Sequence, residues 1–118
     1  MKYFNESEFR CPCGCGLSFS NMQEDALKAL EISRVFASTP FIITSSIRCK
    51  DHNNAVGGSK TSSHLKGCAF DIHCASSDDR MKMVKSFLAS RFTRIGIGKN
   101  FIHIDTDKDK PEGLIWLY

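Results

Sequence analysis

Residues 63–72 read S-H-L-K-G-C-A-F-D-I, and residues 101–105 read F-I-H-I-D. The first stretch carries His64 and Asp71 and the second carries His103, so together they supply two imidazoles and one carboxylate. Three such ligands, with a fourth position left to water, are typical of a catalytic zinc site, whereas structural zinc sites close with four protein ligands. Zinc lowers the pKa of its bound water and polarises a carbonyl group, which is what amide hydrolysis requires. The pattern therefore indicates a small zinc hydrolase.

The same two stretches predict how these ligands reach one place. Because side chains alternate along a strand, His103 and Asp105 are expected to share one face, with the intervening isoleucines on the other. Asp71 lies on a second predicted strand, G-C-A-F-D-I-H-C at residues 67–74. His64 precedes that strand at the mouth of a polar loop. We expect the four polar side chains to converge on one face of a sheet whose other face is apolar.

The rest of the chain predicts an α+β fold. Apolar residues at three-to-four spacing predict a helix over residues 21–37, and a second helix begins at Asp78 or Asp79. Further strands are predicted over residues 41–48, 94–98 and 101–106. The polar stretch 49–63 is predicted as a loop. The C-terminal G-L-I-W-L-Y is expected to close the sheet or to pack against it. We therefore expect one domain, residues 1–118, with a central antiparallel sheet and two main helices.

The apolar stripes of the two helices predict their buried faces. In the first helix the stripe runs through Met22, Ala26, Ala29, Leu30, Ser33 and Phe36. In the second helix it runs through Met81, Val84, Phe87, Leu88 and Phe92. Both stripes are expected to face the sheet.

Composition and charge narrow the class of protein. The excess of three positive charges is too small to indicate nucleic acid as a partner. The chain has no apolar run long enough for a transmembrane helix, so no membrane partner is expected. The opening M-K-Y-F-N-E-S-E-F-R carries early charges and no apolar core, so it does not resemble a secretory signal peptide. We expect a monomer that is synthesised in the cytoplasm, and an extracellular target would then require another exit, such as lysis.

Six cysteines are many for 118 residues. Cys11, Cys13 and Cys15 alternate in C-P-C-G-C-G, and the others are scattered at positions 49, 68 and 74. Without a signal peptide the thiols are expected to stay reduced. The alternating cluster is either a compact, glycine-assisted turn or part of a site for a soft metal, and it differs from zinc ribbons, which read C-x2-C twice.

Three segments together resemble a known family. These are residues 43–72, from I-T-S-S-I-R to G-C-A-F-D-I, then I-G-I-G-K-N-F-I-H-I-D-T-D, and the terminal W-L-Y. They resemble the zinc D-alanyl-D-alanine carboxypeptidases, peptidoglycan-cleaving metallopeptidases that share their fold with the hedgehog signalling domain. The similarity runs from about Phe9 to Tyr118, and its core is an arginine followed by S-x-H-x-x-G-x-A-x-D and then H-x-D. The resemblance implies zinc on His64, Asp71 and His103.

The resemblance also implies a substrate-binding and catalytic role for Arg48, and Ser63 beside the first zinc histidine is expected to contact substrate. Arg48 ends a predicted strand just before the loop that leads to the metal ligands. A guanidinium pairs with a carboxylate, such as a D-alanine terminus, in a two-pronged geometry that lysine does not reproduce. The alternative is a surface arginine paired with Asp51 or Glu31.

The general base is where the chain departs from many members of this family. They place Glu or Asp three residues before the last zinc histidine, where this chain has Asn100, whose amide does not accept a proton. Asp105 is the expected substitute because it shares a strand face with that histidine, and another subset of relatives carries the same H-x-D. His52, His73 and Asp107 are weaker candidates.

We therefore expect a zinc peptidase that hydrolyses the stem peptides of bacterial peptidoglycan, as a carboxypeptidase or an endopeptidase. One alternative is an inactive zinc-binding interaction module of the same fold, which Asn100 and the hedgehog likeness favour. Another is a metal or redox protein built on the three alternating cysteines. The small size and absence of wall-binding repeats resemble a phage-encoded lytic enzyme that acts on the wall after lysis, although a cytoplasmic wall-recycling or dipeptide-cleaving enzyme fits nearly as well.

Overall fold

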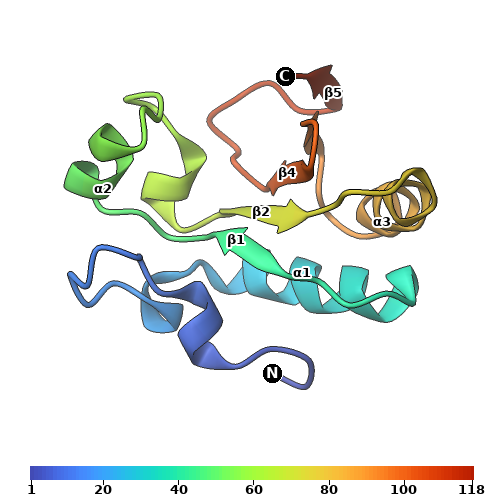
Figure 1. Ribbon diagram of the computed structural model, residues 1–118, viewed down its shortest axis with the longest axis horizontal. Coiled ribbons are helices and arrows are strands. Elements are labelled where there is room, and N and C mark those ends of the chain that lie inside the picture. Colours follow the sequence, from blue (N-terminus) through green and yellow to red (C-terminus); the bar gives the residue numbers. More distant parts are fainter.

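A five-stranded sheet with the strand order β1-β2-β4-β3-β5 lies at the centre of the structure (Figure 1). The computed structural model describes residues 1–118. Its strands are β1 (Ile43–Ser45), β2 (Ala69–His73), β3 (Arg94–Ile97), β4 (Phe101–Asp105) and β5 (Leu114–Leu117). The first four strands pair antiparallel, as predicted, but β5 pairs parallel to β3. Because β4 runs opposite to β3, a single reversal of the chain after β4 leaves β5 running in the direction of β3.

Three α-helices and three short 3-10 helices complete the fold. The α-helices are α1 (Glu24–Ala37), α2 (Lys50–Ala55) and α3 (Ser77–Ala89), and the 3-10 helices are Glu6–Phe9, Phe19–Asn21 and Ser63–Lys66. The two predicted helices correspond to α1 and α3, which pack against each other. Figure 1 shows α1 and the N-terminal segment on the same side of β1. None of the helices combines the length and apolar character needed to cross a membrane.

Helix α2 lies within the stretch that was predicted as a loop. Its six residues, K-D-H-N-N-A, have no apolar periodicity, so the sequence pattern does not reveal it. Cys49 caps the start of the helix, because its Sγ accepts a hydrogen bond from the backbone N–H of His52. Its Asn53 side chain is buried and donates to the carbonyl of Ser59 at 2.9 Å. Local capping and this tertiary contact therefore replace hydrophobic patterning.

The apolar face of the sheet forms the core with α1 and α3. Phe70, Ile72, Ile102 and Ile104 are fully buried there, as the alternation along β2 and β4 predicts. Burial of such side chains is the dominant favourable contribution to folding, at about 1.5–3 kcal/mol for each. The opposite face of the same two strands carries Asp71 and other polar residues.

The predicted buried faces of the helices need correction at three positions. Phe36, Met81 and Leu88 are 61%, 64% and 59% exposed. In α3 the predicted Phe87 is buried, and the other buried positions are Met83 and Ser86, which the prediction did not include. Ser86 is buried without an energetic penalty because its hydroxyl donates to the Met83 carbonyl at 2.6 Å. Because Ser86 is polar, the apolar pattern did not mark it as buried and pointed to the exposed Leu88 instead.

Candidate active site

The candidate metal ligands lie in a row across the sheet. Asp71 on β2 pairs with His103 on β4, His103 pairs with Gly96 on β3, and Gly96 pairs with Trp116 on β5. Residues directly opposite in neighbouring strands project from the same face. His64 joins this row from the 3-10 helix Ser63–Lys66, which leads into β2. The predicted convergence of the two histidines and the aspartate on one face is confirmed.

The three ligand groups meet at Oδ1 of Asp71. This oxygen lies 3.2 Å from Nε2 of His64 and 3.0 Å from Nδ1 of His103. One ligand atom from each residue lies within 4.8 Å of the others. Both imidazoles are buried, so their positions are fixed by packing rather than by solvent-exposed rotamers.

The hydrogen bonds on the outer side of each imidazole fix which nitrogen carries a proton. Nδ1 of His64 lies 2.7 Å from the carbonyl oxygen of Ser46, which only accepts, so Nδ1 donates and Nε2 presents its lone pair to Asp71. Nε2 of His103 lies 2.7 Å from Oδ2 of Asp105. This ring therefore donates through Nε2, and in its neutral form Nδ1 presents a lone pair toward Asp71.

Two imidazole lone pairs and a carboxylate oxygen thus face one another. Such an arrangement is stable only with a cation among the three atoms, either a proton on a ring or a metal ion. Two nitrogens and one carboxylate oxygen are ligands that zinc prefers, and three of them leave a position for water. The outer hydrogen bonds are the kind that orient metal-bound histidines. The residues present therefore fit a zinc ion.

The electrostatics of Asp71 agree with this arrangement. Burial opposes ionisation, but hydrogen bonds and charge from His103 and His64 hold the pKa of Asp71 well below its usual range. For His103, burial acts to lower the pKa, but the carboxylates of Asp105 and Asp71 outweigh it and raise the pKa above its ordinary value. A ring that readily gains a proton at this point also favours a metal ion in its place.

Asp105 lies behind His103 rather than beside the metal ligands. Its Oδ2 accepts from His103, while Oδ1 accepts from Nε of Arg94 at 2.9 Å and from the backbone N–H of Asp107 at 3.1 Å. The side chain is fully buried. Although burial acts to raise it, the hydrogen bonds from His103 and the Asp107 amide lower the pKa of Asp105. The predicted common face with His103 is confirmed, but both carboxylate oxygens are already engaged.

Arg48 reaches the ligands, as predicted. Its terminal nitrogen lies 3.6 Å from Oδ2 of Asp71, and it does not pair with Asp51 or Glu31. Two further contacts hold the guanidinium: Nε donates to Ser45 at 3.0 Å and Nη1 donates to Oδ1 of Asn53 at 3.2 Å. The guanidinium is thus positioned from three sides beside a metal ligand.

Ser63 is buried and its hydroxyl has partners within the protein. It donates to Oδ2 of Asp107 at 2.7 Å and accepts from Lys110 at 3.0 Å. Asp107 also accepts from Lys66 at 3.0 Å. The assignment of Ser63 to substrate binding stays a prediction, and Asp107 is held in an ion-pair network.

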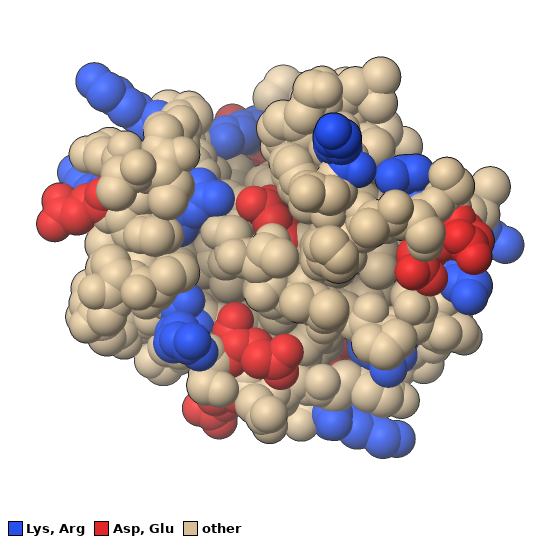
Figure 2. Space-filling model, in the orientation of Figure 1, with Lys and Arg blue, Asp and Glu red and all other residues tan.

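A polar cleft surrounds these groups. It consists of two adjoining hollows, each of about 370 Å³, that share Arg48 and Asp71 in their linings. The first hollow is also lined by His52, His73 and Asn100, and neither imidazole there makes a side-chain hydrogen bond. Figure 2 shows acidic and basic side chains close together in a hollow near the middle of this face, and no continuous basic stripe across it.

Trp116 forms a wall of the second hollow, a position that sequence analysis did not assign to it. Its ring lies 5.7 Å from the His103 ring and 4.9 Å from the Arg94 guanidinium. Gly96 makes this packing possible, because a Cβ there would lie 2.7 Å from the Trp116 ring. The only sequence signal for this contact is a glycine within a strand, which often marks a close approach of another group.

Comparison with protein families gives one match. The family described as Peptidase M15 matches residues 2–105, which include the three candidate ligands, Arg48 and Asp105. The match ends before Trp116. Comparison with curated proteins gives no significant match.

Proposed function

This chain belongs to the peptidase M15 family, and from that premise we propose that it is a zinc-dependent peptidase that hydrolyses the stem peptides of bacterial peptidoglycan. The observation that carries the proposal is the convergence of two imidazole lone pairs on Oδ1 of Asp71. Zinc held by His64, Asp71 and His103 would supply a Lewis acid and an activated water molecule.

Residues around the ligands would orient His103 and transfer the proton. Asp105 fixes the tautomer and orientation of His103, which is the role of a carboxylate bound to the outer nitrogen of a metal-binding histidine. We propose this positioning role in preference to the general base predicted from sequence, because Asp105 is buried with both oxygens engaged. Proton transfer then falls to an imidazole in the first hollow, His52 or His73.

Arg48 is the proposed anchor for the substrate. Its guanidinium lines both hollows beside Asp71, so it can bind a carboxylate of the peptide or the oxygen of the scissile carbonyl. If it binds the terminal carboxylate of a D-Ala-D-Ala peptide, the enzyme acts as a carboxypeptidase. If it binds a carbonyl within the chain, the enzyme acts as an endopeptidase, and the second hollow holds further residues.

A matched pair of substrates tests this proposal. Purified zinc-loaded protein is incubated with a stem pentapeptide that ends in D-Ala-D-Ala and with the same peptide amidated at its C-terminus. A carboxypeptidase anchored by Arg48 should lose most of its turnover upon amidation, and an Arg48→Ala variant should lose this preference. An endopeptidase should cleave both peptides equally at an internal bond.

The competing function is a zinc-binding interaction module without catalytic activity. Two observations favour it: Asn100 stands at the usual base position, and Asp105 is buried behind His103. Protein that holds zinc at the histidine site, yet cleaves neither peptide nor intact peptidoglycan, would establish this alternative in place of the peptidase.

A further inference from the structure

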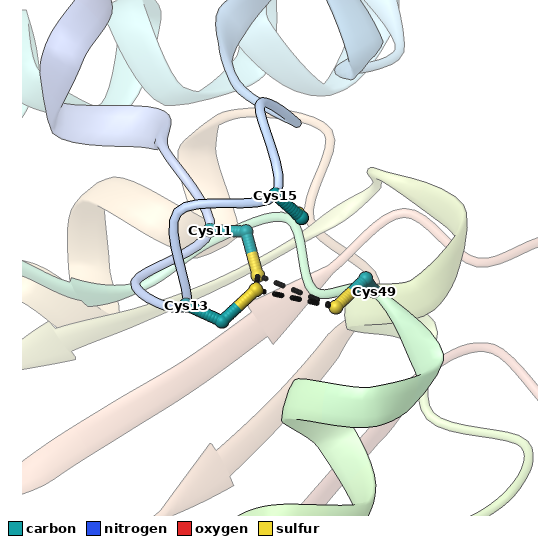
Figure 3. Close-up of side chains that lie close together, drawn as sticks. All are labelled: Cys11, Cys13, Cys15 and Cys49. Atoms are coloured by element: carbon teal, nitrogen blue, oxygen red, sulfur yellow. Dashed lines mark hydrogen bonds between the residues drawn. The ribbon is translucent and has the colours of Figure 1, made fainter.

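Four cysteines from two distant parts of the chain converge at the start of α2, where Cys49 follows Arg48 in the sequence. Cys11, Cys13 and Cys15 lie on one N-terminal loop, and Cys49 immediately precedes α2. Their sulfur atoms all lie within 4.8 Å of one another. Figure 3 shows the sulfurs of Cys11, Cys13 and Cys49 turned toward each other, with Cys15 beside them on the same loop.

The distances between the sulfurs match those of ligands around one metal ion. Sγ of Cys11 lies 3.6 Å from that of Cys13 and 3.9 Å from that of Cys49, and the last two are 3.5 Å apart. A tetrahedral zinc ion with Zn–S bonds of about 2.3 Å places its sulfurs about 3.8 Å apart. A disulfide would require about 2.05 Å, and all six cysteines are free.

The loop is shaped by its own residues to present these thiols. The N–H of Cys11 donates to the carbonyl of Leu17 at 2.8 Å, which closes the loop at its base. Gly14 and Gly16 have φ angles of +80° and +96°, which side-chain-bearing residues rarely adopt, so the glycines allow alternate cysteines to turn inward. The loop is anchored to the core by Phe9, which is fully buried.

We propose that Cys11, Cys13, Cys15 and Cys49 bind a second zinc ion in a closed, structural site. Four thiolates leave no position for water, so this ion has no catalytic role and instead ties the N-terminal loop to the start of α2. Four soft sulfur ligands in tetrahedral arrangement are selective for zinc or iron over harder cations such as magnesium. The site is separate from the histidine ligands, and its existence does not depend on peptidase activity.

The position of Cys49 links the proposed cysteine site to the backbone of Arg48. Cys49 follows Arg48 directly, and the N–H of Arg48 donates to the carbonyl of His64 at 3.1 Å. A metal ion at Cys49 would therefore restrain the backbone that carries the guanidinium and, through His64, the first ligand of the other site. This arrangement predicts that loss of the cysteine-bound metal loosens Arg48 before it affects His103 on β4.

Metal analysis of the full-length chain tests the proposal. Protein is expressed with zinc and a phosphine reductant, passed over a weak chelator and measured for zinc by mass spectrometry. The wild type should retain about two zinc ions per chain, and His103→Ala should retain about one. A Cys13→Ser/Cys15→Ser double variant should also retain about one, whereas Cys74→Ala, which removes a cysteine outside the cluster, should retain two.

Two further measurements use no cysteine variant, so they remain informative even if the cysteine variants fail to fold. Cobalt added to metal-free His103→Ala protein should give the charge-transfer absorption of a tetrahedral tetrathiolate. The exposed Cys13 and Cys15 should react with a thiol reagent far more slowly in zinc-loaded than in metal-free protein. Wild-type protein that carries only one zinc, shows no thiolate-to-cobalt band and reacts at once at both exposed thiols would overturn the proposal.

Discussion

The two candidate metal sites of this protein differ in almost every physical respect. The histidine site is built on β2 and β4, in the most regular part of the sheet, and its two imidazoles are oriented by Ser46 and Asp105. The cysteine site is built on an irregular loop and one residue before a short helix, and two of its thiols are exposed. The first offers three candidate ligands beside a cleft, and the second offers four candidate thiol ligands. If both sites bind zinc as proposed, the sheet orients the ligands of the first site before the metal binds, whereas the loop of the second site would gain order from its metal.

Removal of a histidine ligand should separate the two sites most clearly. His103→Ala leaves two ligands at its site, so zinc binding there and peptide cleavage should both fall to background, while the cysteine site keeps its ion. The Cys13→Ser/Cys15→Ser variant should show the reverse pattern, with the histidine-bound zinc retained. Zinc content and stem-peptide cleavage are measured on the same samples. Cleavage at the wild-type rate by His103→Ala would refute the active-site assignment.

A change at Asp105 tests whether the rigidity of the histidine site comes from its outer hydrogen bonds. Asp105→Asn should weaken zinc binding by roughly 10- to 100-fold, because the amide orients His103 less firmly than a carboxylate does. It should also lower the melting temperature, since Arg94, whose side chain is 11% exposed, loses its ion pair. Competition with a zinc chelator measures the affinity, and Asp107→Asn, a nearby change that does not touch the imidazole, should leave it nearly unaltered. If Asp105→Asn binds zinc as tightly as wild type but has lost all turnover, Asp105 is the base.

Acidification should release zinc from the histidine site. Burial opposes it, but Asp105 and Asp71 raise the pKa of His103 above its ordinary 6.5, so protons compete with zinc as the pH falls through that raised value. In metal-free protein the protonated ring contributes stability that is fully present below pH 6.5 and is lost as the pH rises through the raised pKa.

The increase in melting temperature that zinc produces should therefore be larger at about pH 8 than at about pH 5.5. Thermal unfolding of metal-free and zinc-loaded protein at both pH values measures it. His103→Ala, which should lose the zinc of the histidine site and keep that of the cysteine site, serves as the control for the cysteine-bound ion. A difference in melting temperature that narrows as the pH rises would contradict the assigned protonation state of His103.

The conservative substitution of Arg48 separates the anchor from the metal ligands. Arg48→Lys should keep zinc at both sites and lower kcat/KM by roughly tenfold, because the two-pronged contact with a carboxylate or carbonyl is lost. Arg91→Lys, an exposed change of the same kind, serves as the control. Kinetics with the stem pentapeptide measure the effect, and an unchanged kcat/KM would remove Arg48 from the mechanism.

The smallest effect is expected at Gly58, which lines the second hollow but is not a candidate metal ligand. A Cβ at this position would collide with the side chain of Asn53, which holds Arg48. Gly58→Ala should therefore lower kcat/KM by roughly three- to tenfold, about 0.7–1.4 kcal/mol, without loss of zinc. Gly113→Asn, at a glycine with open space around it, provides a control for glycine replacement. Equal kinetics for Gly58→Ala and wild type would show that Asn53 does not position the guanidinium.

Sequence patterns predicted the sheet and its polar face because both depend on local alternation. The order H-x-D and the run around Asp71 placed side chains on the correct faces before any pairing was known. The parallel addition of β5 was not predictable in this way, since it depends on how residues 106–113 cross the end of the sheet. The six-residue α2 was missed because its stability comes from a cap and a buried asparagine rather than from apolar periodicity.

In the candidate site, too, features that depend on local sequence pattern were predicted, and those that depend on tertiary contacts were not. Ligand types and spacing predicted His64, Asp71 and His103 as ligands, and the structure brings these three residues together. The reach of Arg48 followed from its place at the end of a predicted strand. The contacts of Asp105 with Arg94 and with the outer nitrogen of His103 could not be foreseen. A shared strand face does not reveal which atoms of its neighbours a carboxylate approaches. Cys49 also stood apart from the other cysteines in sequence, and only the fold brings it to the N-terminal loop.

The pairing of β2 with β4 has a consequence for the folding of this chain. The register that sets Ile72 against Ile102 in the core also sets Asp71 against His103 in the site. A slip of one residue would invert the strand that moves, turning its ligand inward and its isoleucine outward, so a chain with mispaired strands would lack one of the three zinc ligands. If the histidine site binds zinc as proposed, its occupancy would measure the fraction of molecules whose central strands are correctly paired, and hence the yield of refolding.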